Sequence, residues 1–242
     1  MRRRLHLRNS AGQVWLRAGT RRRRRIGMIC LSLALLPATE AGAVNLETKE
    51  TPDKAATTIV LTGHIEAGDG LKVRGYVGGL PQGKSIVAYL AFGGGVRSEA
   101  MSIGRFFHQA GVRTVVPKGA RCISPCPLVL VGGSDPVTKK GSYLKYSSAR
   151  IGFSGMTLSF PDKVYTAADL DNAVAGVQTD ILQIADYLQA VGAKRDMLRF
   201  YESVLKPNEV RYLSDEETLD LGIPVMDEGT GKVIEPLPAQ RY

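Results

Sequence analysis

The sequence predicts an α/β fold that forms a single domain. Over residues 57–226, segments with the pattern of strands alternate with segments whose apolar residues recur at helical spacing. One strand-like run, 85–92, is almost continuously apolar, which is typical of a strand buried on both faces of a sheet. There are no internal repeats, and the 199 residues after residue 43 suffice for one domain with a sizeable core.

The first 43 residues have the pattern of an export signal. They contain ten arginines and one acid, Glu40, and an apolar run at 26–38 precedes the small-residue sequence Ala41-Gly42-Ala43. The apolar run is too short to span a bilayer comfortably. We therefore expect cleavage near Ala43 and a periplasmic or secreted protein without a stable membrane span. The alternatives are an uncleaved anchor and a wrong start codon.

This leader also accounts for the basic charge of the chain. The sequence has 32 basic and 23 acidic side chains, and removing ten and one of them with the leader leaves 22 of each. A neutral domain gives no electrostatic support for nucleic-acid binding, so we expect no nucleic-acid partner.

The first half of the domain is predicted to contain two strands and one helix. The expected elements are a polar linker at 44–56, strands at 57–62 and 85–92, and a helix at 99–110 that ends at Gly111. The glycines within 71–80 weaken any helix there, so this stretch is left without a defined element.

The second half is predicted to contain strands followed by helices. The expected elements are one or two strands within 143–160, a long helix from Thr166 to about residue 191, a helical piece at 195–205, a short helix after the capping box Ser214–Glu217, and a C-terminal tail at 227–242.

The segment between these halves, RTVVPKGARCISPCPLVLVGG at 113–133, has features of a catalytic turn. A short strand at 114–116 leads to Ser124, and an apolar helix-like run at 125–131 follows. A serine at such a turn lies near helix N-terminal amides, which favour a developing anion. Gly93 and Gly94 end the preceding strand and would let backbone N–H groups face a ligand. Ser124 is thus a candidate nucleophile; the simpler alternative is a serine that caps a helix.

Four segments in this order resemble the Clp/crotonase superfamily: TIVLTGHI, YLAFGGGV followed by SIGRFF, VVPKGARCISPCPLVLVGG, and LSDEETLDLGIP. The sequence looks closest to secreted bacterial proteins related to the proteolytic subunit of the Clp protease. The resemblance covers about 57–225 and implies a spiral of ββα units. It also implies an oxyanion hole at Gly93 and Gly94 and a nucleophile at Ser124, between Cys122 and Cys126. Members often assemble into trimers or rings, so the resemblance allows a homo-oligomer.

The sequence departs from this family at the groups that would activate the serine. Ser154 occupies the position of the family's histidine, and Val210 that of its aspartate. Pro125, directly after the serine, lacks a backbone N–H. A serine without an adjacent base is a poor nucleophile. The resemblance therefore favours a degenerate hydrolase that binds a peptide or another acyl-containing ligand, with no cofactor and no metal.

Two questions of chemistry stay open at this point. Ser124 could act as a hydrolase nucleophile with an unconventional base, which would be Ser154 or one of Lys139, Lys140 and Lys145. Cys122 and Cys126 could be a catalytic thiol, a zinc pair with His64 and His108, or a disulfide. An oxidising compartment favours the disulfide.

A second motif, GGLPQGKS at Gly78–Ser85, matches the phosphate-binding P-loop pattern. A P-loop follows a strand and opens a helix, whereas here a run of strand-forming residues follows. Nucleotide binding at this segment is therefore only a distant alternative.

Overall fold

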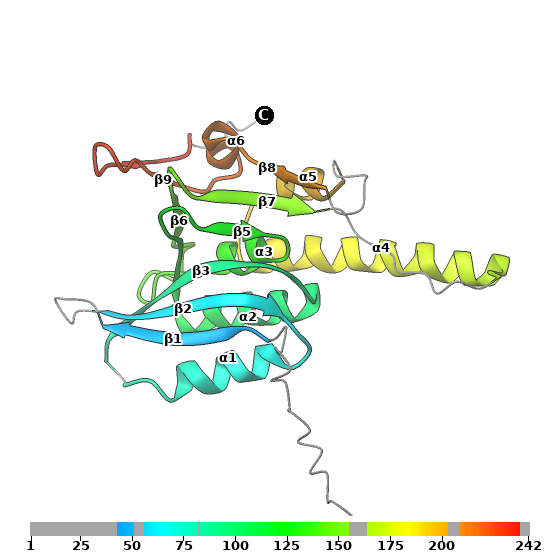
Figure 1. The fold of residues 1–242 in the computed structure, drawn as a ribbon, viewed down its shortest axis with the longest axis horizontal. Coiled ribbons are helices and arrows are strands. Elements are labelled where there is room, and N and C mark those ends of the chain that lie inside the picture. Colours follow the sequence, from blue (N-terminus) through cyan, green and yellow to red (C-terminus); the bar gives the residue numbers. More distant parts are fainter. Residues whose placement is uncertain (1–42, 51–55, 82, 155–163, 203–208, 238–242) are drawn as a thin grey trace, which may run out of the picture. The chain divides into compact units, whose positions relative to one another are not determined.

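The computed structural model describes residues 43–50, 56–81, 83–154, 164–202 and 209–237 (Figure 1). These residues form a single mixed α/β unit, as the sequence predicted, and its sheet is curled. The predicted export signal lies outside the described residues except for Ala43. Within the described part of the chain, no helix has the length and apolar character needed to cross a membrane.

The segment expected to be a linker begins with a strand. Strand β1 (Asn45–Glu50) pairs antiparallel with β2 (Ala56–Ile65). Val44, which precedes β1, is fully buried; its N–H donates to Asp69 Oδ2 at 3.0 Å, and its carbonyl accepts from Lys72 Nζ at 2.6 Å. The prediction of a loose linker is wrong here because a polar edge strand carries little hydrophobic signal and forms by pairing with its neighbour.

Strand β3 (Ser85–Gly95) is the point at which the sheet divides. It pairs in parallel with β2 on one side over almost its whole length. On the other side, its first half pairs with β4 (Arg113–Val116), and its end pairs at Gly93 with β5 (Arg121–Ile123). The first half of β3 therefore belongs to one set of strands, which contains β4, and its end belongs to a second set, which contains β5.

Each set continues with further strands. Strand β4 pairs with β6 (Tyr143–Tyr146), followed by β9 (Val225–Met226) and β10 (Val233–Ile234); β5 pairs with β7 (Arg150–Ser154), followed by β8 (Val210–Tyr212). The β9–β10 pair is an antiparallel hairpin, so the expected C-terminal tail at 227–242 is wrong for its first residues. Strands of only two residues are too short for their sequence pattern to be distinguished from that of a loop.

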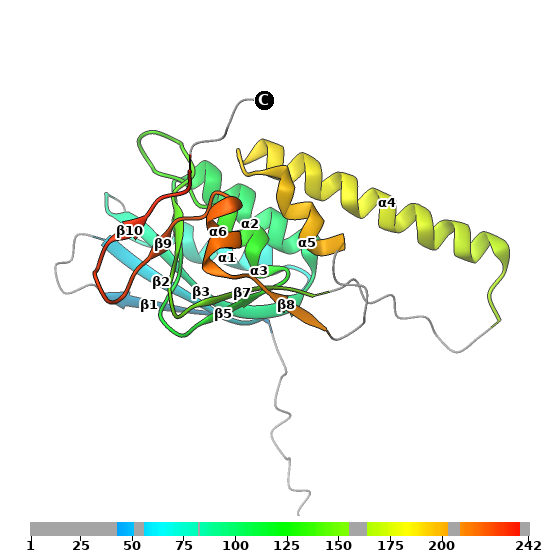
Figure 2. The same cartoon turned by 90° about the horizontal axis from the view of Figure 1, so that it is seen from above.

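Helices α1 (Asp69–Gly78), α2 (Arg97–Ala110) and α3 (Cys126–Val131) lie on one side of the strands (Figure 2). Helix α2 confirms the predicted helix at 99–110. Helices α2 and α3 pack backbone against backbone, because a Cβ on Gly132 would lie 2.5 Å from the Cα of Gly104. Helix α1 forms despite its glycines because Val73 and Val77 are buried in the core.

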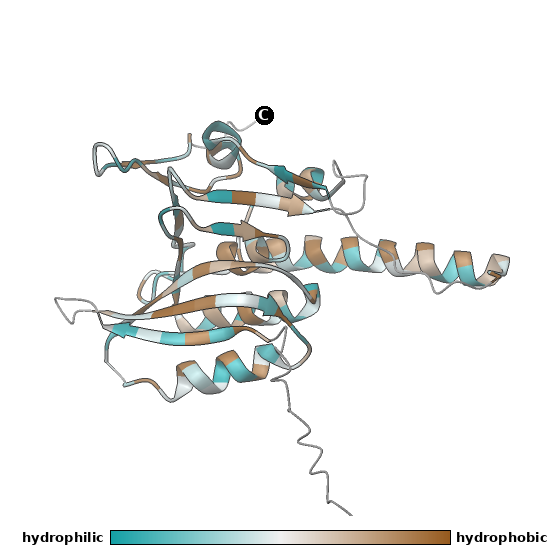
Figure 3. Ribbon diagram, in the orientation of Figure 1, coloured by the Kyte–Doolittle hydropathy of each residue, from teal (hydrophilic) through white to brown (hydrophobic). Residues whose placement is uncertain are grey.

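The long helix α4 (Ala167–Ala190) confirms its prediction, and its start is fixed by a capping box between Thr166 and Asp169. Apolar and polar residues alternate along it at helical spacing (Figure 3). Only the C-terminal part of its apolar stripe is covered, since Leu188 is fully buried whereas Leu170 is 52% exposed.

Three short helices complete the described elements. The expected helical piece at 195–205 consists of a 3-10 turn, η1 (Arg195–Met197), and α5 (Leu198–Glu202). Helix α6 (Asp215–Asp220) begins at the predicted capping box, in which Ser214 and Glu217 bond reciprocally.

The order of elements around the segment 78–85 does not match that of a P-loop. Helix α1 ends at Gly78 and strand β3 begins at Ser85, so the glycine-lysine segment runs from a helix to a strand. A P-loop needs the reverse order, because it presents phosphates to the first turn of the following helix. The segment Gly78–Ser85 therefore lacks the strand–loop–helix context of a P-loop.

Candidate functional site

The residues singled out as a catalytic site lie together around one cavity. Gly93, Gly94, Ser124 and Ser154 all line a hollow of about 480 Å³. Its remaining lining residues are Gly63, His64, Ala91, Phe92, Arg121 and Ile123. Strands β2, β3, β5 and β7 and the turn after β5 supply them, so the cavity lies where the two sets of strands meet. Its volume is within the usual range for a small-ligand site.

The backbone of Ser124 is fixed between two strands. Its N–H donates to the carbonyl of Gly152 at 3.0 Å, and its own carbonyl accepts from the N–H of Gly94 at 2.9 Å. These two bonds continue the pairing of β3, β5 and β7 beyond the last residue of β5. Ser124 thus holds a defined position at the end of a strand, as the strand-to-turn prediction required.

A disulfide between Cys122 and Cys126 encloses the serine, with the two Cα atoms 5.2 Å apart. Both cysteines are fully buried. The predicted disulfide is therefore present, and the thiol and zinc alternatives are wrong, because neither sulfur is free. No three His, Cys, Asp or Glu side chains of the described ranges are grouped closely enough to hold a metal ion.

The anion-stabilising groups expected beside Ser124 are largely occupied or absent. The N–H of Gly94, expected to face a ligand, is used by the carbonyl of Ser124. Pro125 has no N–H to offer, and Pro127 removes another from the first turn of α3. An oxyanion hole needs free donors aimed at the developing charge. The first turn of α3 and the N–H of Gly94 therefore supply few such donors.

Ser124 also has no base within hydrogen-bond distance. Its Oγ is buried and has no hydrogen-bond partner of ordinary geometry among the described residues. Of the proposed lysines, Lys145 donates to Asp215 Oδ1 at 2.5 Å and Lys139 to the carbonyl of Gln109 at 3.4 Å. None of the three lysines lines the cavity, whereas Ser154 does.

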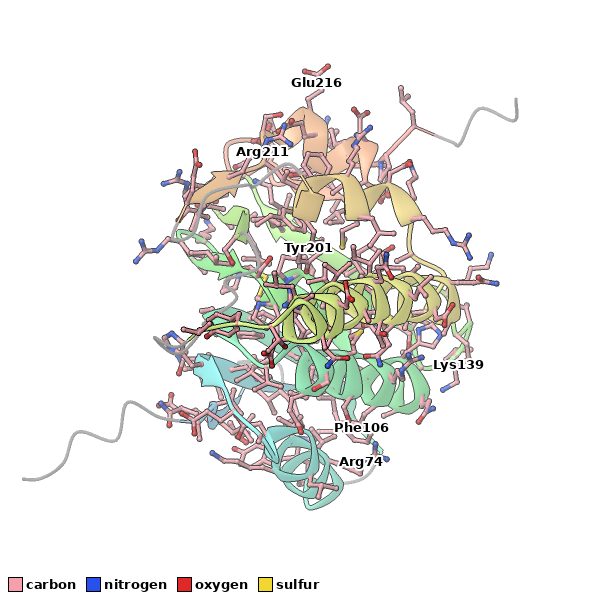
Figure 4. All side chains as sticks on the ribbon, turned by 90° about the vertical axis from the view of Figure 1, so that its right-hand side faces the viewer. Arg74, Phe106, Lys139, Tyr201, Arg211 and Glu216 are labelled. Carbon is pink, nitrogen blue, oxygen red and sulfur yellow. A yellow bond between two sulfur atoms is a disulfide. The ribbon has the colours of Figure 1, made fainter. Side chains whose placement is uncertain are left out.

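Tyr201 of α5, which is labelled in Figure 4, is a neighbour of Ser124 that the sequence did not indicate. Burial raises the pKa of Tyr201 to about 12, while the Ser124 hydroxyl and the Arg97 guanidinium act in the opposite direction. The ring meets that of Phe153 edge-on, with 4.9 Å between centroids. Like Ser124 Oγ, the Tyr201 hydroxyl is buried without a partner of ordinary geometry in the described part of the chain. The two hydroxyls thus lie near each other, and the tyrosine is protonated at neutral pH.

His64 lies at the rim of the same cavity because of an irregularity in β2. The pairing of β2 with β3 shifts between Gly63 and Ile65, and Gly63 adopts a positive φ of 94°. A Cβ on Gly94 would lie 2.7 Å from Cδ2 of His64, so the imidazole lies directly against the Gly94 backbone. The histidine is near the site but makes no hydrogen bond to Ser124 Oγ.

No protein-family model matches this sequence, and no curated protein is significantly similar to it.

The sequence identified the residues of the central turn but not those brought to it by folding. Tyr201 is far from Ser124 along the chain, and His64 does not match the spacing of a catalytic base. Arg121 lies within the central segment, but its sequence context gave no sign of a role. The weak irregularity Gly63-His64 at the end of a predicted strand was the one local signal that could have indicated the rim histidine.

Proposed function

We propose that this is an exported protein of Clp/crotonase-like fold that has lost hydrolytic activity and binds a peptide or another acyl-containing ligand in the cavity beside Ser124. The succession β4–β5–α3 and β6–β7–α4 supports a spiral of ββα units, since each pair of strands is followed by a helix. The buried disulfide supports export, because disulfides persist in oxidising compartments.

The observation that carries the loss of activity is the environment of the Ser124 hydroxyl. An effective serine nucleophile needs a base in hydrogen-bond contact, and Ser124 Oγ has none among the described residues. Tyr201 is a polar neighbour of Ser124, but a tyrosine with a pKa of about 12 holds its proton at neutral pH. A group that keeps its proton donates hydrogen bonds and does not accept the serine proton.

The first experiment treats the purified protein with a fluorescent fluorophosphonate, which labels activated serines. We expect no labelling of the wild type, of Ser124→Ala or of Tyr201→Phe, beside strong labelling of an active serine hydrolase as control. Labelling of the wild type that disappears in Ser124→Ala would contradict the proposal. It would support instead a serine hydrolase that uses an unconventional base.

The second experiment tests binding in the cavity. The probes are fluorescent N-acylated tripeptides, and the blocking variant is Ala91→Trp, because Ala91 lines the cavity on β3. Tyr89→Trp is the matched control, since Tyr89 lies two residues earlier on the same strand but does not line the cavity. We expect peptide binding to be lost in Ala91→Trp and retained in Tyr89→Trp. Equal binding by both variants would contradict the proposed location of the site.

A further inference from the structure

The cavity beside Ser124 contains an arginine without a protein partner. Arg121 lies on β5, is exposed, and lines the cavity. It makes no ion pair, side-chain hydrogen bond or ring contact with any residue that the structure describes. An arginine side chain presents several N–H donors in a fixed planar arrangement that suits a carboxylate.

The other arginines of the described ranges all have a partner. Arg97, Arg113 and Arg211 pair with Asp180, Asp135 and Glu217; Arg195 donates to Gln189; and Arg74, Arg105, Arg150 and Arg199 lie over the rings of Phe106, Tyr187, Tyr212 and Phe200. The labelled pair of Arg74 and Phe106 illustrates this arrangement (Figure 4). Arg121 is therefore the exception within the described chain, and it is the one that lines the cavity.

The pairing of β5 with β7 adds to the positive charge at this place. Arg121 stands directly beside Arg150 in the parallel register. Like charges beside each other on neighbouring strands are unfavourable. Arg150 is withdrawn over the ring of Tyr212, with 3.6 Å between its guanidinium carbon and the ring centroid, and no described carboxylate compensates Arg121. An anion bound by Arg121 would relieve this repulsion.

The other lining residues are compatible with a bound anion and favour a carboxylate over a phosphate. Among the described residues, no acidic side chain lines the cavity, and His64 is its other titratable group. Phosphate sites in proteins commonly use several free backbone N–H groups. Here the N–H groups of Gly94 and Ser124 are consumed by pairing between strands. A single planar guanidinium with few backbone donors fits a carboxylate better than a phosphate.

We propose that the cavity recognises a ligand that carries a carboxylate, with Arg121 as its ionic partner. This inference rests on the proposed function, because it assigns the ligand class of the same cavity. The carboxylate belongs either to the C-terminus of a peptide or to an acidic side chain, and both present the same group to Arg121.

The test compares three fluorescent probes at low salt: an N-acylated trialanine with a free C-terminus, the same peptide as its amide, and an amide with a central glutamate. We expect at least one carboxylate probe to bind about tenfold more tightly than the trialanine amide, which corresponds to one charge-assisted contact. Tighter binding of the free acid identifies a C-terminal carboxylate, and tighter binding of the glutamate probe identifies an acidic side chain.

The variants are Arg121→Gln, Arg121→Lys and, as the matched control, Arg150→Gln. Arg121→Gln should abolish the preference for the carboxylate, Arg121→Lys should keep part of it, and Arg150→Gln should leave it intact. Circular dichroism of each variant checks that the fold is retained. Arg150→Gln changes the net charge equally at a neighbouring position, so it separates direct contact from long-range attraction.

Two results would overturn the inference in different ways. Equal binding of the acid and amide probes by the wild type, or an equal loss of preference in Arg121→Gln and Arg150→Gln, would refute carboxylate recognition but leave peptide binding in place. The absence of binding by all three probes would refute the proposed function together with the inference.

Discussion

Lys145 and Ser124 are both buried polar side chains, but their surroundings differ completely. The side chain of Lys145 is 2% exposed, and its ammonium has three partners: Asp215 Oδ1 at 2.5 Å and the carbonyls of Ala149 at 2.8 Å and Ser147 at 3.4 Å. The Ser124 hydroxyl has no partner of ordinary geometry in the described chain. Both residues were candidates for catalysis in the sequence.

The difference separates a structural group from a group available to a ligand. An ammonium has three donors, and those of Lys145 are matched by three acceptors, so none remains for the serine. A buried hydroxyl without a partner carries a desolvation cost that a bound water or ligand atom can offset. We interpret Lys145 as a structural group that links β6 to α6, and Ser124 as part of a site.

The largest expected effect concerns the structural group. Asp215→Asn leaves the buried ammonium of Lys145 with carbonyl acceptors but no counter-charge. Breaking a buried ion pair costs several kcal/mol, and the half-exposed Asp215 reduces this to about 3 kcal/mol in the free energy of unfolding. Urea unfolding at neutral pH measures the change.

The control for this prediction is Glu216→Gln on the next residue of α6. Glu216 points away from the rest of α6 (Figure 4), so we expect a change within about 0.5 kcal/mol. If Asp215→Asn and Glu216→Gln changed the free energy of unfolding equally, the ion pair of Lys145 would have no special structural role. The contrast between Lys145 and Ser124 would then be lost.

The second effect concerns the tyrosine beside Ser124. Burial raises the pKa of Tyr201 from 10.0 to about 12, so above pH 10 the unfolded chain loses this proton while the folded protein keeps it. The folded protein then binds more protons, and stability falls as the pH rises through this window. Between pH 9 and pH 11 the wild type should lose about 1 kcal/mol more than Tyr201→Phe. Tyr89, Tyr143 and Tyr187, whose pKa values burial also raises, are present in both proteins.

Urea unfolding at the two pH values gives this difference directly. The same dependence on pH in the wild type and in Tyr201→Phe would mean that the Tyr201 hydroxyl is hydrated. The surroundings of the Ser124 hydroxyl would then be hydrated, and the contrast between Ser124 and Lys145 would be weaker.

The sequence predicted those elements whose signals are local. The apolar run of β3, the periodicity of α2 and α4, and the capping box of α6 each lie within a few turns of chain, and all of them are present. The central turn with its disulfide also followed from one short segment.

The elements and residues that were missed depend on partners far away in the chain. Strand β1 exists through its pairing with β2, and Val44 is held by side chains of α1. Tyr201 lies beside Ser124 only because α5 packs there. The lack of a partner for the Arg121 side chain among the described residues likewise becomes visible only in the folded structure. No local pattern encodes such a contact.

The smallest effect compares two buried serines. Ser134 is fully buried and its hydroxyl donates to the carbonyl of His108 at 2.7 Å. Ser134→Ala leaves that carbonyl without its partner and should cost about 1 kcal/mol in the free energy of unfolding. Ser124→Ala removes a hydroxyl with no such bond, so we expect a change near zero or a slight stabilisation. Urea unfolding of both variants, with the disulfide intact, measures the pair. A cost for Ser124→Ala as large as that for Ser134→Ala would mean that an ordered water already satisfies Ser124. In that case the hydroxyl would belong with Lys145, among the structural groups of the fold.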